Sequence, residues 1–183
     1  MNSNLNINQA VDALKSGEVI AYPTEAVYGL GCDPWNEEAI KQILDIKQRP
    51  WQKGLIIVAA NLQQLQPFIA PLSADTLKLV EATWPGPTTW ILPASEGLPA
   101  CLIGDHDSIA VRVTAHLQTA DLCRKFGGPV VSTSANRAGE DPAKTQQQVQ
   151  LLLPEIKHVL SGECLGADKP TEIRDATTGE KLR

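Results

Sequence analysis

Residues 47–60 have the sequence KQRPWQKGLIIVAA, in which three closely spaced cations precede a continuous apolar run. Pro50 lacks a backbone N–H and disfavours helical geometry at the residue before it, so a helix that arrives here should end. The apolar run has no polar residue on either face, which is typical of a strand buried between two layers. The stretch therefore predicts a helix-to-strand connection that presents three positive charges, Lys47, Arg49 and Lys53, unless it is only a solvated basic loop.

The surrounding sequence alternates predicted helices and strands. Asn36 is a good N-cap, and the apolar spacing after it predicts the helix that ends near Lys47. The alternation predicts an α/β fold, a single domain over residues 1–183 with a twisted, mixed β-sheet flanked by helices. Other helices are predicted at 7–16, 61–66, 73–83, 117–126 and 145–153, the last with a capping box of Thr145 and Gln148, and strands at 19–22, 55–60, 88–92, 108–113, 129–131, 157–160 and 171–175.

Composition limits the class of protein. The 183 residues are 43% hydrophobic and carry a formal charge of −5, which suits one buried core and argues against broad, non-specific nucleic-acid binding. A polar N-terminus and the lack of any run near ~18 apolar residues predict a soluble cytoplasmic protein with no membrane contact. The four scattered cysteines predict free thiols and no protein-bound metal.

Three further segments carry candidate ligand groups. YPTEAVYGLG, residues 22–31, follows a strand with a polar, glycine-containing loop that suits a small polar ligand or simply a tight turn. In SIAVRV, residues 108–113, alternation places Ser108 and Arg112 on one face, as in an anion pocket or on an exposed edge strand. STSAN, residues 132–136, follows a buried strand and suits either a phosphate or ribose contact or a Ser/Asx turn.

These segments occur in an order that closely resembles the YrdC (TsaC) family of threonylcarbamoyl-AMP synthases. The Lys-x-Arg and Ser-x-Asn elements of that family match this chain at four positions, and the resemblance extends to the PTEIRD ending. It implies a single YrdC-like domain with a concave ligand-binding face. Ala26 departs from the pattern where many members have a second Thr, and Val58 where longer members have His. The four matching positions are Lys47, Arg49, Ser134 and Asn136.

The resemblance also implies a reaction. L-threonine, bicarbonate and ATP, with Mg²⁺ expected on the triphosphate, would give threonylcarbamoyl-AMP and pyrophosphate for N6-threonylcarbamoyladenosine in tRNA. Downstream threonylcarbamoyl-transferase proteins would take the product. Lys47 and Arg49 would be catalytic, with Lys47 between the two substrates. Threonine would contact Thr24, Ser132, Thr171 and, through its carboxylate, Arg112, whereas ATP would contact Arg49, Lys53, Ser108, Ser134, Asn136 and Arg183.

Two other functions use the same residues. An RNA-binding or ribosome-maturation module would hold tRNA or double-stranded RNA on the basic face without turnover. A carbamoyl-adenylate-forming domain, as in hydrogenase maturation proteins, would not depend on threonine. In each case the cation cluster is expected to serve ligands rather than the fold, so Arg49 should be dispensable for stability.

Overall fold

A mixed β-sheet forms the centre of the computed structural model, which describes residues 3–167 and 171–182. Within these ranges the sheet has nine strands in the order β1-β8-β2-β3-β7-β4-β6-β5-β9. Neighbours β4 and β6 are parallel, whereas β3, β7 and β4 pair in antiparallel fashion, so the predicted mixed sheet is confirmed. The strands are β1 (Ser3–Leu5), β2 (Ile20–Pro23), β3 (Tyr28–Gly31), β4 (Ile56–Ala59), β5 (Thr88–Pro93), β6 (Ser108–Val113), β7 (Val130–Ser134), β8 (His158–Leu160) and β9 (Glu172–Asp175).

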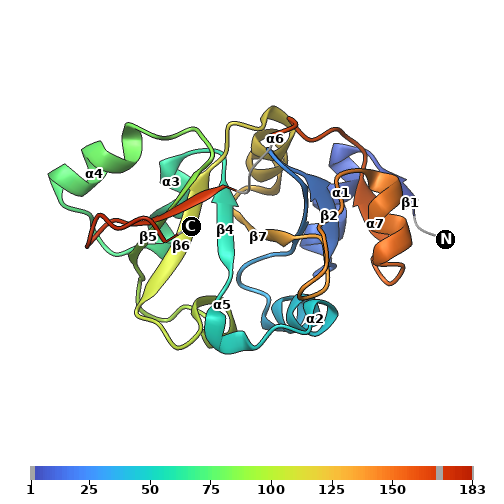
Figure 1. The fold of residues 1–183 in the computed structure, drawn as a ribbon, viewed down its shortest axis with the longest axis horizontal. Coiled ribbons are helices and arrows are strands. Elements are labelled where there is room, and N and C mark those ends of the chain that lie inside the picture. The colour runs from blue at the N-terminus through green and yellow to red at the C-terminus, as the bar shows by residue number, and fades with distance from the viewer. Residues whose placement is uncertain (1–2, 168–170, 183) are drawn as a thin grey trace.

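Side-chain caps begin most of the helices. Asn36, Asn61, Ser73 and Thr145 each accept a hydrogen bond from the backbone N–H three residues later, which satisfies a donor that the first helical turn leaves free. Figure 1 shows α4 near one end of the molecule and α7 near the other, with the sheet between them. The helices are α1 (Ile7–Lys15), α2 (Glu37–Lys47), α3 (Leu62–Leu65), α4 (Ala74–Glu81), α5 (Ala100–Ile103), α6 (Leu117–Phe126) and α7 (Gln146–Leu152), with 3-10 turns at Trp51–Lys53 and Gln66–Phe68.

The apolar run of β4 packs on both faces of the sheet, as its sequence predicts. Ile57 and Ala59 belong to the larger core cluster, which includes the buried residues of α2. Val58 and Ala60 belong to a second cluster with α1 and α6. Successive side chains of a strand point to opposite faces, so the sheet lies between these two groups of helices.

Several local predictions were wrong. The 22–31 segment is not one loop, because Tyr28–Gly31 forms β3 and pairs with β2 as a hairpin. Neither β1 nor α5 was predicted. Gln148 completes no capping box, since its side-chain oxygen accepts from the N–H of Lys144 at 2.7 Å.

All four cysteines carry free thiols. Over residues 3–167 and 171–182 the structure contains no helix with both the length and the apolarity to cross a membrane.

Two leucines of α6, Leu117 and Leu122, provide a matched test of the packing. Leu122 is fully buried and Leu117 is 82% exposed. Leu122→Ala should lower the free energy of unfolding by about 2–5 kcal/mol, because it removes buried methyl groups and leaves a cavity. Leu117→Ala should change it by no more than about 0.5 kcal/mol. Urea unfolding of both variants measures this, and equal losses would contradict the assigned core.

Candidate active site

A cavity of about 850 Å³ opens on the face of the sheet that carries α1 and α6. Ile56 of β4 lies on the same face as Val58 and is paired in register with Ala110 of β6 and Ser132 of β7. These three residues line the cavity, whereas Val58 packs beneath the helices. The cavity therefore occupies the part of this face that the two helices leave uncovered, and its size suits a small-molecule substrate.

The structure gathers the predicted site residues around this one cavity. Their individual roles stay predictions, and Arg183 lies outside the described residues. Three further lining residues, His106, Asp141 and Lys144, were not predicted, because they lie in loops without a recognisable pattern. The ten predicted residues that line the cavity are Thr24, Lys47, Arg49, Lys53, Ser108, Arg112, Ser132, Ser134, Asn136 and Thr171.

The cavity is strongly cationic although the chain as a whole is acidic. Its described lining includes five Lys or Arg side chains against one carboxylate, that of Asp141, in a chain of formal charge −5. Among the described residues no group of three or more His, Cys, Asp or Glu side chains is arranged to hold a metal ion. Concentrated positive charge within a concave wall favours a ligand with several anionic groups.

Lys47, the last residue of α2, is 5% exposed and reaches the end of β7. Its ammonium donates to the main-chain oxygens of Ser134 at 2.6 Å and Asn136 at 2.9 Å, and to Oδ1 of Asn136 at 2.9 Å. Burial lowers the pKa of Lys47 from 10.5 to about 8, and the charge of Arg49 acts in the same direction. The ammonium of Lys47 therefore starts to lose its proton at mildly alkaline pH.

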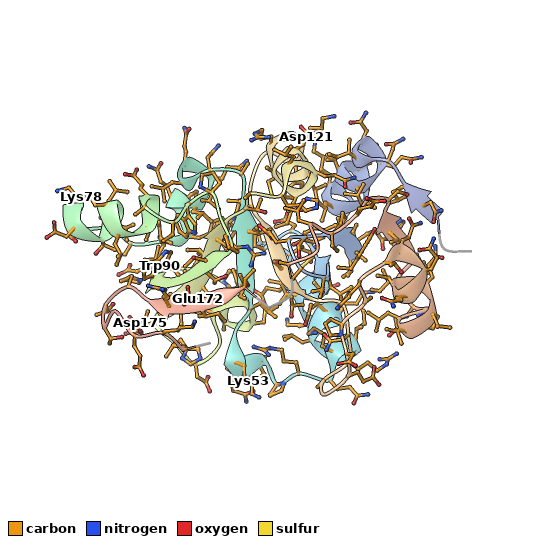
Figure 2. The ribbon with its side chains drawn as sticks, turned by 45° about the horizontal axis from the view of Figure 1, so that its top comes forward. Lys53, Lys78, Trp90, Asp121, Glu172 and Asp175 are labelled. Atoms are coloured by element: carbon orange, nitrogen blue, oxygen red, sulfur yellow. The ribbon has the colours of Figure 1, made fainter. Side chains whose placement is uncertain are left out.

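The two cations that follow Lys47 differ in exposure. Arg49 is half-buried, and its Nη2 donates to the main-chain oxygen of Gly54 at 3.1 Å. The prediction that Arg49 serves only ligands is therefore incomplete, because the guanidinium also closes the turn into β4. Lys53 is exposed, and Figure 2 shows it at the lower edge of the molecule.

Arg112 is buried in the middle of the sheet, so the alternative of an exposed edge-strand arginine was wrong. Strand β6 lies between β4 and β5, and Arg112 is 4% exposed. Its Nη1 donates to the hydroxyls of Thr171 at 3.1 Å and Thr89 at 3.3 Å. Its Nη2 lies 3.5 Å from Oε2 of Glu25, a residue that was not singled out in the sequence.

Glu25 is an ionised partner for this arginine. Burial alone would raise the pKa of Glu25, but the Arg112 guanidinium and a hydrogen bond from Thr114 outweigh it and hold the pKa below its usual value. Each side chain of the pair is 5% exposed. The pair therefore holds the guanidinium of Arg112 in a fixed position at the cavity wall.

Polar side chains at two strand ends form turns and also line the cavity. Ser134 Oγ donates to Oδ1 of Asn136 at 2.6 Å, and Nδ2 of Asn136 donates to the main-chain oxygen of Glu140 at 2.6 Å. Thr24 Oγ1 donates to the main-chain oxygen of Val27 at 2.7 Å. The turn and ligand interpretations of these segments are thus compatible, since hydrogen bonds within each turn hold its hydroxyls and amide at the cavity wall.

A family model described as "Telomere recombination", for Sua5, YciO and YrdC proteins, matches residues 12–183. The chain belongs to the Sua5/YciO/YrdC family. It is 51% identical over 181 residues to a protein of Vibrio parahaemolyticus named threonylcarbamoyl-AMP synthase, covering 97% of this chain and 98% of that protein. The predicted resemblance to the family is confirmed.

Solved structures share the fold. P. abyssi Sua5 complexed with L-threonine has a TM-score of 0.87 and 31% identity, covering 93% of this chain and 51% of that one. E. coli YciO has a TM-score of 0.80 and 26% identity, covering 92% of this chain and 82% of that one. The present chain thus spans about half of P. abyssi Sua5 and most of E. coli YciO.

Substitution of the two cations in the turn tests their different structural roles. Arg49→Ala should lower the free energy of unfolding by about 1–2 kcal/mol, because it removes a charge-assisted hydrogen bond to Gly54. Lys53→Ala should change it by no more than about 0.5 kcal/mol, since that side chain is exposed. Urea midpoints of both variants measure this, and an unaffected Arg49→Ala protein would restore the view that Arg49 serves only ligands.

Proposed function

We propose that this protein is a threonylcarbamoyl-AMP synthase, which converts L-threonine, bicarbonate and ATP into threonylcarbamoyl-AMP and pyrophosphate. The observation that carries the proposal is the gathering of ten predicted ligand residues around one cationic cavity. A relative with this name is about half identical over nearly the whole chain. A solved relative at 31% identity was crystallised with L-threonine.

The chemistry explains why the cavity is so cationic. The amine of threonine attacks the carbon of bicarbonate, a C–N bond forms, and a C–O bond breaks with loss of water. One oxygen of the resulting N-carboxylate then attacks the α-phosphorus of ATP. An oxygen-to-phosphorus bond forms, the bond to the bridging oxygen breaks, and pyrophosphate leaves. All the reacting groups are anionic, so their repulsion is the main obstacle, and fixed cations in a shielded site lower it. No cysteine or histidine is needed as a nucleophile.

The cations of the cavity suggest one binding region for each of the two substrates. Arg112, with Thr171 bonded to it, suits the carboxylate of threonine, because a guanidinium can donate two parallel hydrogen bonds. Arg49 and Lys53 suit the phosphates, which would enter as the Mg²⁺ complex of ATP. Asp141 is the sole carboxylate among the described lining residues, which favours a metal carried by the triphosphate rather than by the protein.

Lys47 lies between these two groups of residues in the proposed assignment. Its ammonium holds Ser134 and Asn136 in place through their oxygens and adds positive charge where the N-carboxylate would meet the α-phosphate. A fixed charge needs no reorganisation during the reaction, so catalysis would come from positioning and electrostatic stabilisation.

The concave placement of the cations disfavours the RNA-binding alternative. Lys47 and Arg112 are 5% and 4% exposed, so the backbone of a folded RNA has little access to them. The carbamoyl-adenylate alternative differs in its need for threonine, and the activity assay separates it from the present proposal.

Pyrophosphate release with one substrate omitted at a time tests the function. We expect slow release that requires ATP, L-threonine and bicarbonate together. Serine should be a poorer substrate by about tenfold, because a pocket gains only about 1–3 kcal/mol from a methyl group. Equal release without threonine would favour the carbamoyl alternative, and an RNA-dependent rise in melting temperature without ATP-dependent stabilisation would favour the RNA-binding module.

The pH dependence of kcat/KM for ATP tests the position of Lys47. This parameter reports ionisations of the free enzyme. Because the pKa of Lys47 is lowered to about 8, its charge should be lost as the pH rises through that value, and kcat/KM should fall.

A Lys47→Arg variant is the control, since a guanidinium stays charged above pH 12. Its profile should lack the alkaline decline, whatever its absolute rate. The ratio of the two profiles cancels the ionisations of threonine and bicarbonate. A constant ratio between pH 7 and about 9.5 would contradict this role for Lys47.

A further inference from the structure

Glu25 lies behind the cationic cavity and takes no part in its described lining, although its partner Arg112 does. Glu25 is 4% exposed, which is rare for a carboxylate unless charges and hydrogen bonds compensate for burial. A group that does not reach the cavity cannot accept a proton directly from a substrate bound there. Any contribution of Glu25 to the reaction must therefore pass through a neighbouring residue.

Two donors fix the carboxylate of Glu25 on the side away from Arg112. Thr114 Oγ1 donates to Oε1 at 2.6 Å, and the N–H of Ala115 donates to the same oxygen at 3.2 Å. The second oxygen, Oε2, has no hydrogen-bond partner among the described residues and lies 3.5 Å from Nη2 of Arg112. The carboxylate thus has one anchored oxygen and one oxygen directed at the guanidinium.

Arg112 is held through both terminal nitrogens of its guanidinium. Its Nη1 is bonded to two hydroxyls, of Thr89 and Thr171, and its Nη2 pairs with Glu25. Its Nε is buried and has no hydrogen-bond partner within residues 3–167 and 171–182. A buried N–H without a partner is costly, so a further acceptor next to Arg112 would stabilise it.

From this geometry we infer that Glu25 is a positioning residue for substrate binding, which aligns the Arg112 guanidinium so that it receives the carboxylate of L-threonine. This inference rests on the proposed function. The main chain around Glu25 is also held in place. The main-chain oxygen of Glu25 accepts from the N–H of Ala167 at 3.1 Å, and the main-chain oxygen of Thr24 accepts from the N–H of Leu165 at 3.3 Å. Glu25 is therefore fixed from several directions.

Electrostatics explains why a carboxylate is used for this task. A neutral hydroxyl would orient the guanidinium but would leave a full positive charge buried without an ionic partner when no substrate is bound. The carboxylate compensates that charge in the empty protein. Glu25 does not line the cavity, so the threonine carboxylate adds to the arrangement rather than replacing Glu25.

The Glu25→Gln variant is the direct test. An amide cannot replace this carboxylate, because its NH₂ would face either the Arg112 N–H groups or the Ala115 N–H. We expect the dissociation constant of L-threonine, measured by calorimetry on folded protein, to rise about tenfold or more. The dissociation constant of ATP should stay within about twofold, since Arg49 and Lys53 are untouched.

A second pair of variants keeps the test decisive if Glu25→Gln does not fold. Thr114→Val removes the hydroxyl that donates to Glu25 and keeps the side-chain shape, whereas Thr114→Ser keeps the hydroxyl. Thr114 does not line the cavity. Thr114→Val should weaken threonine binding about three- to tenfold, and Thr114→Ser should remain within about twofold of the wild type.

Each outcome has one meaning. Selective loss of threonine affinity in Glu25→Gln or Thr114→Val, with recovery in Thr114→Ser, supports the inference. Unchanged threonine affinity, or equal weakening of threonine and ATP, overturns it, because a purely structural role predicts one of these results. If the wild-type protein itself fails to bind L-threonine, the proposed function fails, and this is seen before any variant is compared.

Discussion

The ammonium of Lys47 connects two segments that the rest of the site depends on. Lys47 is the last residue of α2, and its ammonium donates to oxygens of Ser134 and Asn136, which lie 87 and 89 residues further along the chain. A buried ammonium without acceptors would be very unfavourable, so the end of β7 must lie against the end of α2. This contact fixes the Lys-x-Arg turn beside the Ser-x-Asn turn. Strand β7 is the central strand of the described sheet, between β3 and β4, so this contact lies at the middle of the sheet.

Much of the fold could be predicted because its signals are local. The bounds of β6 and α6 agree with the sequence prediction, since strict alternation marks the strand and Gly127 ends the helix in a left-handed conformation. Asn36 and the alternation of helices with strands located α2 and the domain class in the same way. Placing the predicted residues in one site depended on the family resemblance, because no local pattern brings Thr24 close to Arg112.

What was missed depends on contacts between distant segments. Tyr28–Gly31 forms a strand because it pairs with β2 and β7. Its two glycines are typical of a turn, so the sequence did not predict this strand. The glycine at position 31 is required there, since a Cβ would lie 2.5 Å from the main-chain oxygen of Val131. Glu25 gave no sign of being buried, because its partner is 87 positions away in sequence. The bond from Arg49 to Gly54 could not be predicted either, since exposure of a loop side chain follows from the tertiary fold.

In the proposed function, one cavity holds both L-threonine and ATP, with Lys47 between them. A crystal structure with L-threonine and a non-hydrolysable ATP analogue bound together tests it most directly. The threonine carboxylate should lie within hydrogen-bond distance of Arg112, the triphosphate should lie beside Arg49 and Lys53, and the threonine amine should point at the α-phosphate near the Lys47 ammonium. Either ligand bound outside the cavity, or threonine bound with its carboxylate away from Arg112, would contradict it.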